Sequence, residues 1–294
     1  MANATPTAPG AIPRHAIGFD AALLSKNLVA EERLFLEAWE YLPRVAGNIS
    51  AMFQGALNTA GLRAVVDPDN ALLRQDMLRA ARSACAMADM VRQGIGPVHV
   101  DIGLGSSVDV ARLSKNDVFN VVDLRRALFA AIIARDSASI EALCRVDPRS
   151  LRTPGSIVDD YAFTFAEFLQ EMLTRSPDAG AKIVQAMAET DPAVLKTGNI
   201  DYALYIAVGE IDCFYGLSAP DGAMLNEKLA MALVNHRKFY DAEVTLGRSQ
   251  RNDPRGFIAL GPLAAAALAH DHGRSVTVKS DYLPDGLVDG RFVG

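Results

Sequence analysis

The chain has 294 residues, of which 50% are hydrophobic and 22% charged, so its composition is that of a globular protein and excludes a disordered one. The net charge is −6, and lysine and arginine are not clustered, which argues against a general nucleic-acid binder and suits a basic partner. The three cysteines, Cys85, Cys144 and Cys213, form no CxxC pair and lie among apolar or helix-forming residues. We therefore expect core thiols in a reducing compartment.

The first residues, MANATPTAPGAIPRH, predict a flexible tail over residues 1–16. They offer neither the basic start nor the apolar core of a signal peptide. No stretch of the chain approaches the roughly 18 uninterrupted apolar residues of a membrane-spanning helix. We therefore expect a cytoplasmic protein without membrane contacts, whose residues 17–294 form one α-helical domain.

Helical periodicity dominates the N-terminal part of this domain. Apolar residues recur at three- and four-residue steps over residues 28–41, and Pro43 should end or kink that helix. A second helix is expected over residues 45–60 and should stop at Gly61. A third helix should end at Gly94.

The stretch GPVHVDIGLGSSVDVARL changes the pattern. Val98, Val100 and Ile102 alternate with polar residues, glycines follow, and alternation resumes at Val108 and Val110. This predicts a small two-stranded β-hairpin that packs on the helices, because an isolated hairpin is marginally stable. GLGSSV resembles the start of a dinucleotide loop but has Val108 where the third glycine should be, so turn glycines are the better interpretation.

From residue 118 the helices resume in pairs. NVVDLRRALFAAIIARD precedes SASIEALCRVDP, DDYAFTFAEFLQEMLTRS precedes PDAGAKIVQAMAETDP, and NIDYALYIAVGEIDCFYGL precedes DGAMLNEKLAMALVNHRKFY. Units of about 40 residues are typical of α-hairpin arrays, and an irregular helical bundle is an equal alternative. The predicted fold class is therefore mostly α, an array or bundle of α-helical hairpins with one small β-hairpin near residues 98–110. Its expected parts are N-terminal helices (20–94), a β-hairpin (97–113), paired helices (117–273) and an extended closing segment (274–294).

Few residues point to catalysis or metal binding. His270 and His272 stand two apart in a last helical turn and point in different directions, so they do not form a one-faced ligand pair. His99 and His236 stand alone and indicate surface or hydrogen-bonded histidines. We expect no metal and no cofactor.

Acidic residues concentrate between residues 155 and 216, where ten carboxylates face only three cations. This excess predicts either a solvated face or a docking surface that steers a basic partner. Candidate partner-binding residues are Asp159, Asp160, Glu167, Glu171, Asp201 and Glu210. Asp212 lies in a helix that is apolar nearly all round, and we expect it to form a structural pair inside the core.

The second half of the chain resembles the Immunity 49 family of bacterial polymorphic toxin systems. The resemblance covers roughly residue 120 to the C-terminus, with NDPRGFIALGPLAAAALAHDHGRSVTVKSDYLPDGLV as its most specific part. It implies a mostly α-helical antidote that binds a cognate toxin, and it offers no catalytic motif. The recurring residues have the character of fold determinants: Asp253 in a cap, Gly261 and Pro262 as a kink, and Tyr282 and Pro284 in a docking turn.

The sequence thus predicts an immunity protein that occludes a cytosol-acting toxin without catalysis. The charge excess motivates the further hypothesis that the toxin is a nuclease, whose cleft would be basic. A helical-repeat adaptor or regulator that binds a peptide or protein is the alternative. An enzyme that uses His270, His272 or buried acids is a third hypothesis.

Overall fold

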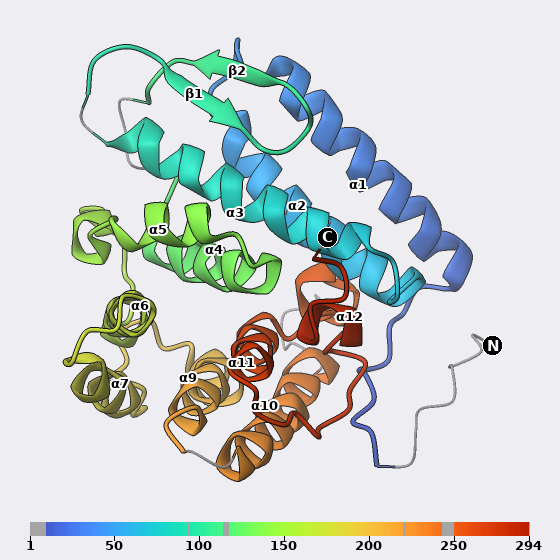
Figure 1. Cartoon of the computed structure of the whole chain (residues 1–294), viewed down its shortest axis with the longest axis vertical. Coiled ribbons are helices and arrows are strands. Elements are labelled where there is room, and N and C mark those ends of the chain that lie inside the picture. Colours follow the sequence, from blue (N-terminus) through green and yellow to red (C-terminus); the bar gives the residue numbers. More distant parts are fainter. Residues whose placement is uncertain (1–9, 93, 114–117, 220–221, 243–249, 294) are drawn as a thin grey trace.

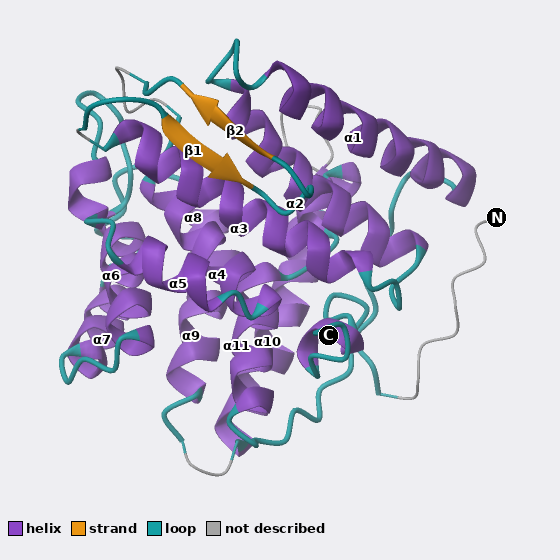
Figure 2. Ribbon diagram, turned by 45° about the horizontal axis from the view of Figure 1, so that its top comes forward, coloured by secondary structure: helices purple, strands orange, loops and turns teal. Residues whose placement is uncertain are grey.

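The computed structural model describes residues 10–92, 94–113, 118–219, 222–242 and 250–293. Within these residues the chain is mostly α-helical and contains one two-stranded antiparallel sheet (Figures 1 and 2). This architecture confirms the fold class predicted from the sequence.

Three helices, α1 (Ala21–Tyr41), α2 (Asn48–Val66) and α3 (Leu72–Val91), pack one against the next in the upper half of the view in Figure 1. The Asp20 side chain caps α1 by accepting a hydrogen bond from the Leu23 amide at 2.8 Å. The expected stop of the second helix at Gly61 is wrong, because α2 continues to Val66. A Cβ on Gly61 would lie 2.0 Å from the Pro254 carbonyl oxygen, so this glycine permits close packing and does not end the helix.

The predicted β-hairpin consists of β1 (Val98–Asp101) and β2 (Ser107–Val110). Their register pairs Val98 with Val110 and Val100 with Val108. The side chains of Val98, Val100 and Val110 are buried, and β1 packs on α3. Alternating valines therefore give the hairpin the apolar face that it needs to be stable on the helices.

The three predicted helix pairs are present. The first is α4 (Val121–Ala134) with α5 (Ser137–Cys144), and the second is α6 (Asp160–Leu173) with α7 (Ala179–Ala188). The third joins α8 (Ile200–Tyr202), a π-helical turn (Ala203–Ala207) and α9 (Val208–Gly216) to α10 (Ala223–Asp241).

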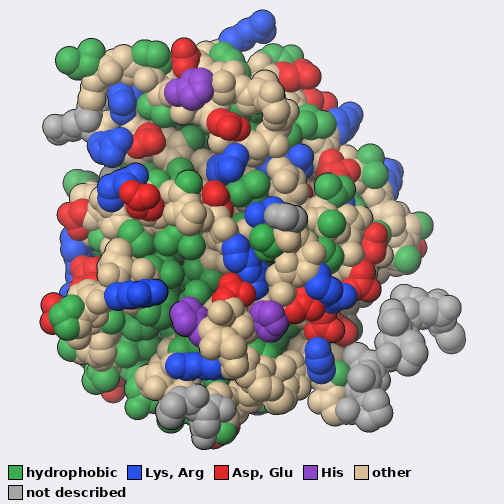
Figure 3. Space-filling view, in the orientation of Figure 1, with side chains coloured by type: hydrophobic (Ala, Val, Ile, Leu, Met, Phe, Trp, Pro, Cys, Tyr) green, Lys and Arg blue, Asp and Glu red, His purple; other side chains and the backbone are tan. Residues whose placement is uncertain are grey.

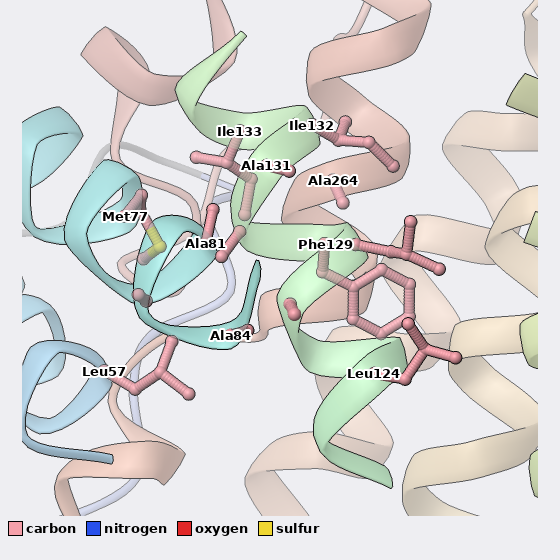
Figure 4. Close-up of a cluster of buried hydrophobic side chains, with 14 of the residues drawn as sticks. Leu57, Met77, Ala81, Ala84, Leu124, Phe129, Ala131, Ile132, Ile133 and Ala264 are labelled. Atoms are coloured by element: carbon pink, nitrogen blue, oxygen red, sulfur yellow. The ribbon is translucent and has the colours of Figure 1, made fainter. Parts of the chain in front are cut away.

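Helix α4 is the centre of the molecule. It contacts α3, α5, α6 and also α11 (Leu260–Asp271), which is distant in sequence. Figure 4 shows Phe129 and Ile132 of α4 on the side of Ala264, while Met77 and Ala81 of α3 lie across the helix from them. In a linear repeat array each unit contacts only its neighbours. The return of α11 to α4 therefore makes this fold a bundle around one buried helix.

Small side chains let α11 approach α4 closely, and the residues from Ala264 to Ala267 are all buried. The structure places Gly261 and Pro262, where a kink was expected, at the start of α11. Both residues lie in the first turn of α11, where proline disturbs no hydrogen bond of the helix. A Cβ on Gly261 would lie 2.6 Å from Cγ of Glu210, so this glycine also makes room for a neighbour.

The closing segment packs as expected around its Tyr-Leu-Pro turn, where Tyr282, Leu283 and Pro284 are buried. It is not extended throughout, because α12 (Asp285–Val288) follows the turn. The Ile12 amide donates to the Lys279 carbonyl at 2.9 Å, and Ile12 forms a parallel bridge with Ser280. Residues 10–16 of the expected tail thus lie along the closing segment, while residues 1–9 are outside the described part.

Candidate binding site

Asp159 is buried and supports the fold. The residue is 5% exposed, and its carboxylate accepts hydrogen bonds from the Lys196 and Thr197 amides at 2.6 and 3.0 Å and from the Thr197 hydroxyl at 2.6 Å. It stands at the start of α6 as expected, yet the amides that it binds belong to another segment. Asp159 therefore ties residues 196–197 to α6.

Asp160 and Glu167 are engaged in ion pairs on the surface of α6. Arg152 and Lys196 lie 2.9 and 2.5 Å from the Asp160 carboxylate. The hydrogen bond from Lys196 has the largest effect on the pKa of Asp160 and lowers it, and the hydrogen bond from Arg152 lowers this pKa further. Arg149 and Lys182 lie 2.5 and 2.6 Å from the Glu167 carboxylate.

These cations change the electrostatics of the expected docking face. Arg149 and Arg152 lie in and beside a 3₁₀ helix (Pro148–Leu151) that precedes the acidic stretch in sequence. Their guanidinium carbons also lie 5.6 and 4.3 Å from the centre of the Phe163 ring, in cation–π contact. A charge count restricted to residues 155–216 omits both arginines, so it overstates the negative field at α6.

The remaining candidates occupy different environments. Asp201 is exposed on α8 and has no hydrogen-bond or ion-pair partner among the described residues. Glu171 is half-buried, and its Oε2 atom lacks a hydrogen bond in the described structure. Asp212 pairs with Lys228 of α10 at 3.2 Å, and this pair is half-buried, whereas a pair inside the core was expected. Asp253 caps the 3₁₀ helix Pro254–Gly256 by accepting from the Arg255 amide at 3.0 Å.

Glu210 belongs to a buried polar group that links α4 to α9. Its Oε2 atom lies 3.4 Å from Nη2 of Arg125, and Nη2 donates to the Tyr202 hydroxyl at 3.1 Å. Burial raises the pKa of Glu210, against the opposing effect of Arg125. Arg125 is 1% exposed, and its Nε and Nη1 atoms have no acceptor among the described residues. The sequence reasoning missed Arg125, although an arginine inside the apolar run of α4 was a usable signal.

A pocket of about 60 Å³ lies where α9 and α10 meet the start of α11. Its walls include aromatic rings from α8, the π-helical turn and α10, and charged groups from α4, α9 and the 3₁₀ helix Pro254–Gly256. Its aromatic and charged lining residues are Tyr202, Tyr205, Tyr240, His236, Glu210, Arg126 and Arg255. His236 is buried, and its Nε2 lies 2.9 Å from the Gly256 carbonyl oxygen, to which it donates. Burial lowers the pKa of His236 to about 4, so its ring is neutral near pH 7.

The π-helical turn accounts for the arrangement of these groups. Tyr202 precedes it, Tyr205 and Ile206 lie in it, and Glu210 follows it, and all four line the pocket. An inserted residue in a helix changes the angular spacing of its side chains, and such turns are frequent at functional sites. The turn thus brings two aromatic rings and a carboxylate to one pocket.

Apolar side chains border the pocket and gather elsewhere on the surface. Ile200, Leu204 and Tyr205 are 42%, 41% and 36% exposed on the α8 and π-helical segment. On the face seen in Figure 3, hydrophobic side chains gather in a hollow between α6 and α7 on one side and α9 and α11 on the other. Exposed apolar areas of this kind mark contact sites for other proteins.

The histidine cluster forms no comparable site. His270 is exposed, the Nδ1 of His272 contacts the Leu268 carbonyl at 2.7 Å, and Asp271 pairs with Arg135 at 3.0 Å. In the part of the chain that the structure describes, no group of three or more His, Cys, Asp or Glu residues could hold a metal ion. Nor does any helix in this part combine the length and apolar character needed to cross a membrane.

The fold and this pocket define a mostly α-helical protein with a small pocket lined by aromatic and arginine side chains. The chain belongs to the Immunity protein 49 family, whose model matches residues 32–287. The match confirms the family resemblance seen in the sequence and extends it to the N-terminal helices. It also supports a role as an immunity protein, with a toxin as partner. No curated protein and no solved structure matches the chain.

Proposed function

We propose that this chain binds one cognate bacterial toxin domain in the cytosol and inhibits it by covering its surface, without catalysing a reaction. Family membership supports the toxin as partner. The observation that carries the mode of action is the exposed apolar edge formed by Ile200, Leu204 and Tyr205 beside the pocket. Burial of aromatic and aliphatic side chains at the centre of an interface supplies most of the binding free energy of protein complexes.

Charge has a smaller part in this proposal than the sequence suggests. Asp160 and Glu167 already have cationic partners, and Asp159 and Glu210 are buried. Asp201 is the candidate carboxylate that is both exposed and unpaired within the described structure. A nuclease toxin with a basic cleft stays a hypothesis that rests on the net charge of −6 and on this residue.

Co-expression with the toxin encoded by the neighbouring gene tests the proposed function. The unaltered chain should restore growth, and the purified proteins should form a complex. Failure of the unaltered chain to protect the cells would contradict the proposed function itself.

Matched substitutions test the proposed surface. Leu204→Asp should weaken the complex at least roughly tenfold, because it places a charge in an apolar contact. Leu34→Asp on α1 is the control, since Leu34 is 52% exposed and lies on a different helix. If Leu34→Asp weakens binding and Leu204→Asp does not, the toxin occupies another face. Asp201→Lys should slow association at low salt and have little effect at high salt.

A further inference from the structure

We propose that the pocket between α9, α10 and α11 receives one tyrosine or tryptophan side chain of the toxin, whose O–H or N–H group donates a hydrogen bond to Glu210. This inference rests on the proposed function and specifies the chemistry of its contact. Three features of the pocket support this inference: a carboxylate that accepts no hydrogen bond from the described residues, arginine side chains near that carboxylate, and aromatic walls around a small space.

Glu210 is an acceptor without a hydrogen-bond donor. The residue is 8% exposed, and none of the described residues donates a hydrogen bond to its carboxylate. Its ion-pair partner Arg125 lies at 3.4 Å without forming a hydrogen bond. A buried carboxylate that lacks donors is costly, so a donor that enters the pocket gains more than one bound to a solvated acceptor.

The surrounding charges disfavour a cationic donor. Arg125 lies 3.4 Å from Glu210, and Arg126 and Arg255 line the pocket. Arg255 is neutralised by Asp253 at 2.6 Å, whereas Arg126 has no hydrogen-bond or ion-pair partner among the described residues. A lysine or arginine of the toxin would therefore approach the guanidinium groups of Arg125 and Arg126. A neutral O–H or N–H group avoids this repulsion.

The walls and the volume select one ring. Tyr202, Tyr205, Tyr240 and His236 contribute aromatic surface, which favours offset or edge-on contact with another aromatic side chain. The space of about 60 Å³ is far below the roughly 300 to 1,000 Å³ of small-molecule sites, so it accommodates the end of one side chain. Tyrosine and tryptophan combine a ring with a neutral donor, and both are enriched at the centres of protein interfaces.

Small aromatic probes test the pocket without the toxin. We would label the isoleucine methyl groups of the full chain and titrate it with p-cresol, indole, toluene and benzylamine. Ile206 and Ile258 line the pocket, and Ile183 on α7 serves as the reference methyl. We expect p-cresol and indole to shift the signals of Ile206 and Ile258 with dissociation constants of about 1 mM. Toluene should bind roughly tenfold more weakly, because it has no donor, and benzylamine more weakly than p-cresol.

Two variants test whether p-cresol binds inside the pocket. Leu260→Trp adds bulk at a half-buried pocket residue and should abolish the shifts caused by p-cresol. Tyr205→Ala removes a partly exposed wall and should weaken p-cresol binding severalfold, with little risk to folding. Tyr41→Ala is the matched control, since Tyr41 is 52% exposed on α1, and it should leave p-cresol binding unchanged.

Each alternative result overturns the inference. Equal affinities of toluene and p-cresol would show that p-cresol forms no hydrogen bond with Glu210. Tighter binding of benzylamine than of p-cresol would contradict the preference for a neutral donor. Probes that shift neither Ile206 nor Ile258 would show that the pocket takes no ring.

Toxin binding separates the inference from the proposed function. Leu260→Trp should weaken binding of the toxin at least roughly tenfold. Unchanged affinity in this variant would mean that the toxin leaves the pocket empty, although the chain still protects the cell. An unaltered chain that binds p-cresol and gives no protection would instead refute the proposed function.

Discussion

The guanidinium of Arg125 on α4 and the carboxylate of Glu210 on α9 form an ion pair, with 3.4 Å between Nη2 and Oε2. The Arg125 side chain is 1% exposed and that of Glu210 is 11% exposed. Removal of one partner from a buried pair leaves the other charge uncompensated. The pair thus holds the pocket wall to the central helix.

We expect Glu210→Gln to lower the free energy of unfolding by about 3 kcal/mol, because it leaves Arg125 as an unpaired buried charge. Arg125→Met should cost a similar amount, and the double variant should cost less than the sum. Glu141→Gln is the control, since Glu141 forms an exposed pair with Arg145 and should change stability by less than about 1 kcal/mol. Urea unfolding of the four variants and the unaltered chain measures these losses, and additive losses would show that the two charges are not coupled.

Gly61 and Gly55 lie on the same helix and should respond to alanine in opposite directions. A Cβ at Gly61 would lie 2.0 Å from a backbone oxygen of Pro254, so Gly61→Ala should destabilise the protein by at least about 2 kcal/mol. At Gly55 the nearest atom is 3.9 Å away, and Gly55→Ala should stabilise by up to about 1 kcal/mol. Thermal unfolding of the two variants compares them directly. Equal effects would place the segment after residue 253 away from α2.

Tyr282 joins the two ends of the described chain. Its hydroxyl accepts from the His15 amide at 2.8 Å and lies 2.9 Å from Nδ1 of His15. Because Nε2 of His15 donates to the Arg251 carbonyl, the neutral ring accepts at Nδ1 from the Tyr282 hydroxyl. Tyr282→Phe removes both bonds and should cost about 1 to 3 kcal/mol. Tyr41→Phe, at an exposed tyrosine, should change stability by less than about 0.5 kcal/mol. Denaturant unfolding that does not distinguish the two variants would contradict this role.

Two buried histidines predict a loss of stability in acid. Burial lowers the pKa values of His15 and His236 to about 4, from an ordinary value of 6.5. Between these values the unfolded chain binds more protons than the folded one, so stability falls as the pH decreases from 6.5 to 4. The loss is at most roughly 3 kcal/mol for each histidine. Asp76 acts in the opposite sense, since burial raises its pKa to about 6.

The difference between His236→Gln and the unaltered chain isolates one histidine from these opposing groups. Glutamine keeps a donor near the Gly256 carbonyl but does not titrate. The free energy of unfolding of the His236→Gln variant should therefore fall less steeply than that of the unaltered chain as the pH decreases from 6.5 to 4. His99→Gln is the control for the substitution itself, because His99 is exposed and pairs with Asp109 at 3.0 Å. Parallel slopes for all three proteins would mean that His236 is protonated equally in both states.

The sequence alone determined the elements and the family. Apolar residues at helical spacing predicted the helix pairs, alternating valines predicted the hairpin, and the Tyr-Leu-Pro turn predicted a packed closing segment. Each of these features depends on residues that are close together in the sequence, so sequence patterns alone can predict it. The closing segment around Asp253 and Tyr282 also carried the resemblance that the match to Immunity protein 49 confirmed.

Only the tertiary structure decided the state of the candidate site. Asp160 is neutralised by Arg152 and Lys196, and Glu210 pairs with Arg125 from a helix 85 positions earlier in the chain. The role of Gly61 is likewise decided by the tertiary structure, because it depends on a backbone oxygen almost two hundred residues later in the chain. Pairing, burial and close contact depend on distances between segments remote in sequence. Composition and periodicity specify which side chains are present, whereas packing around α4 specifies which of them meet.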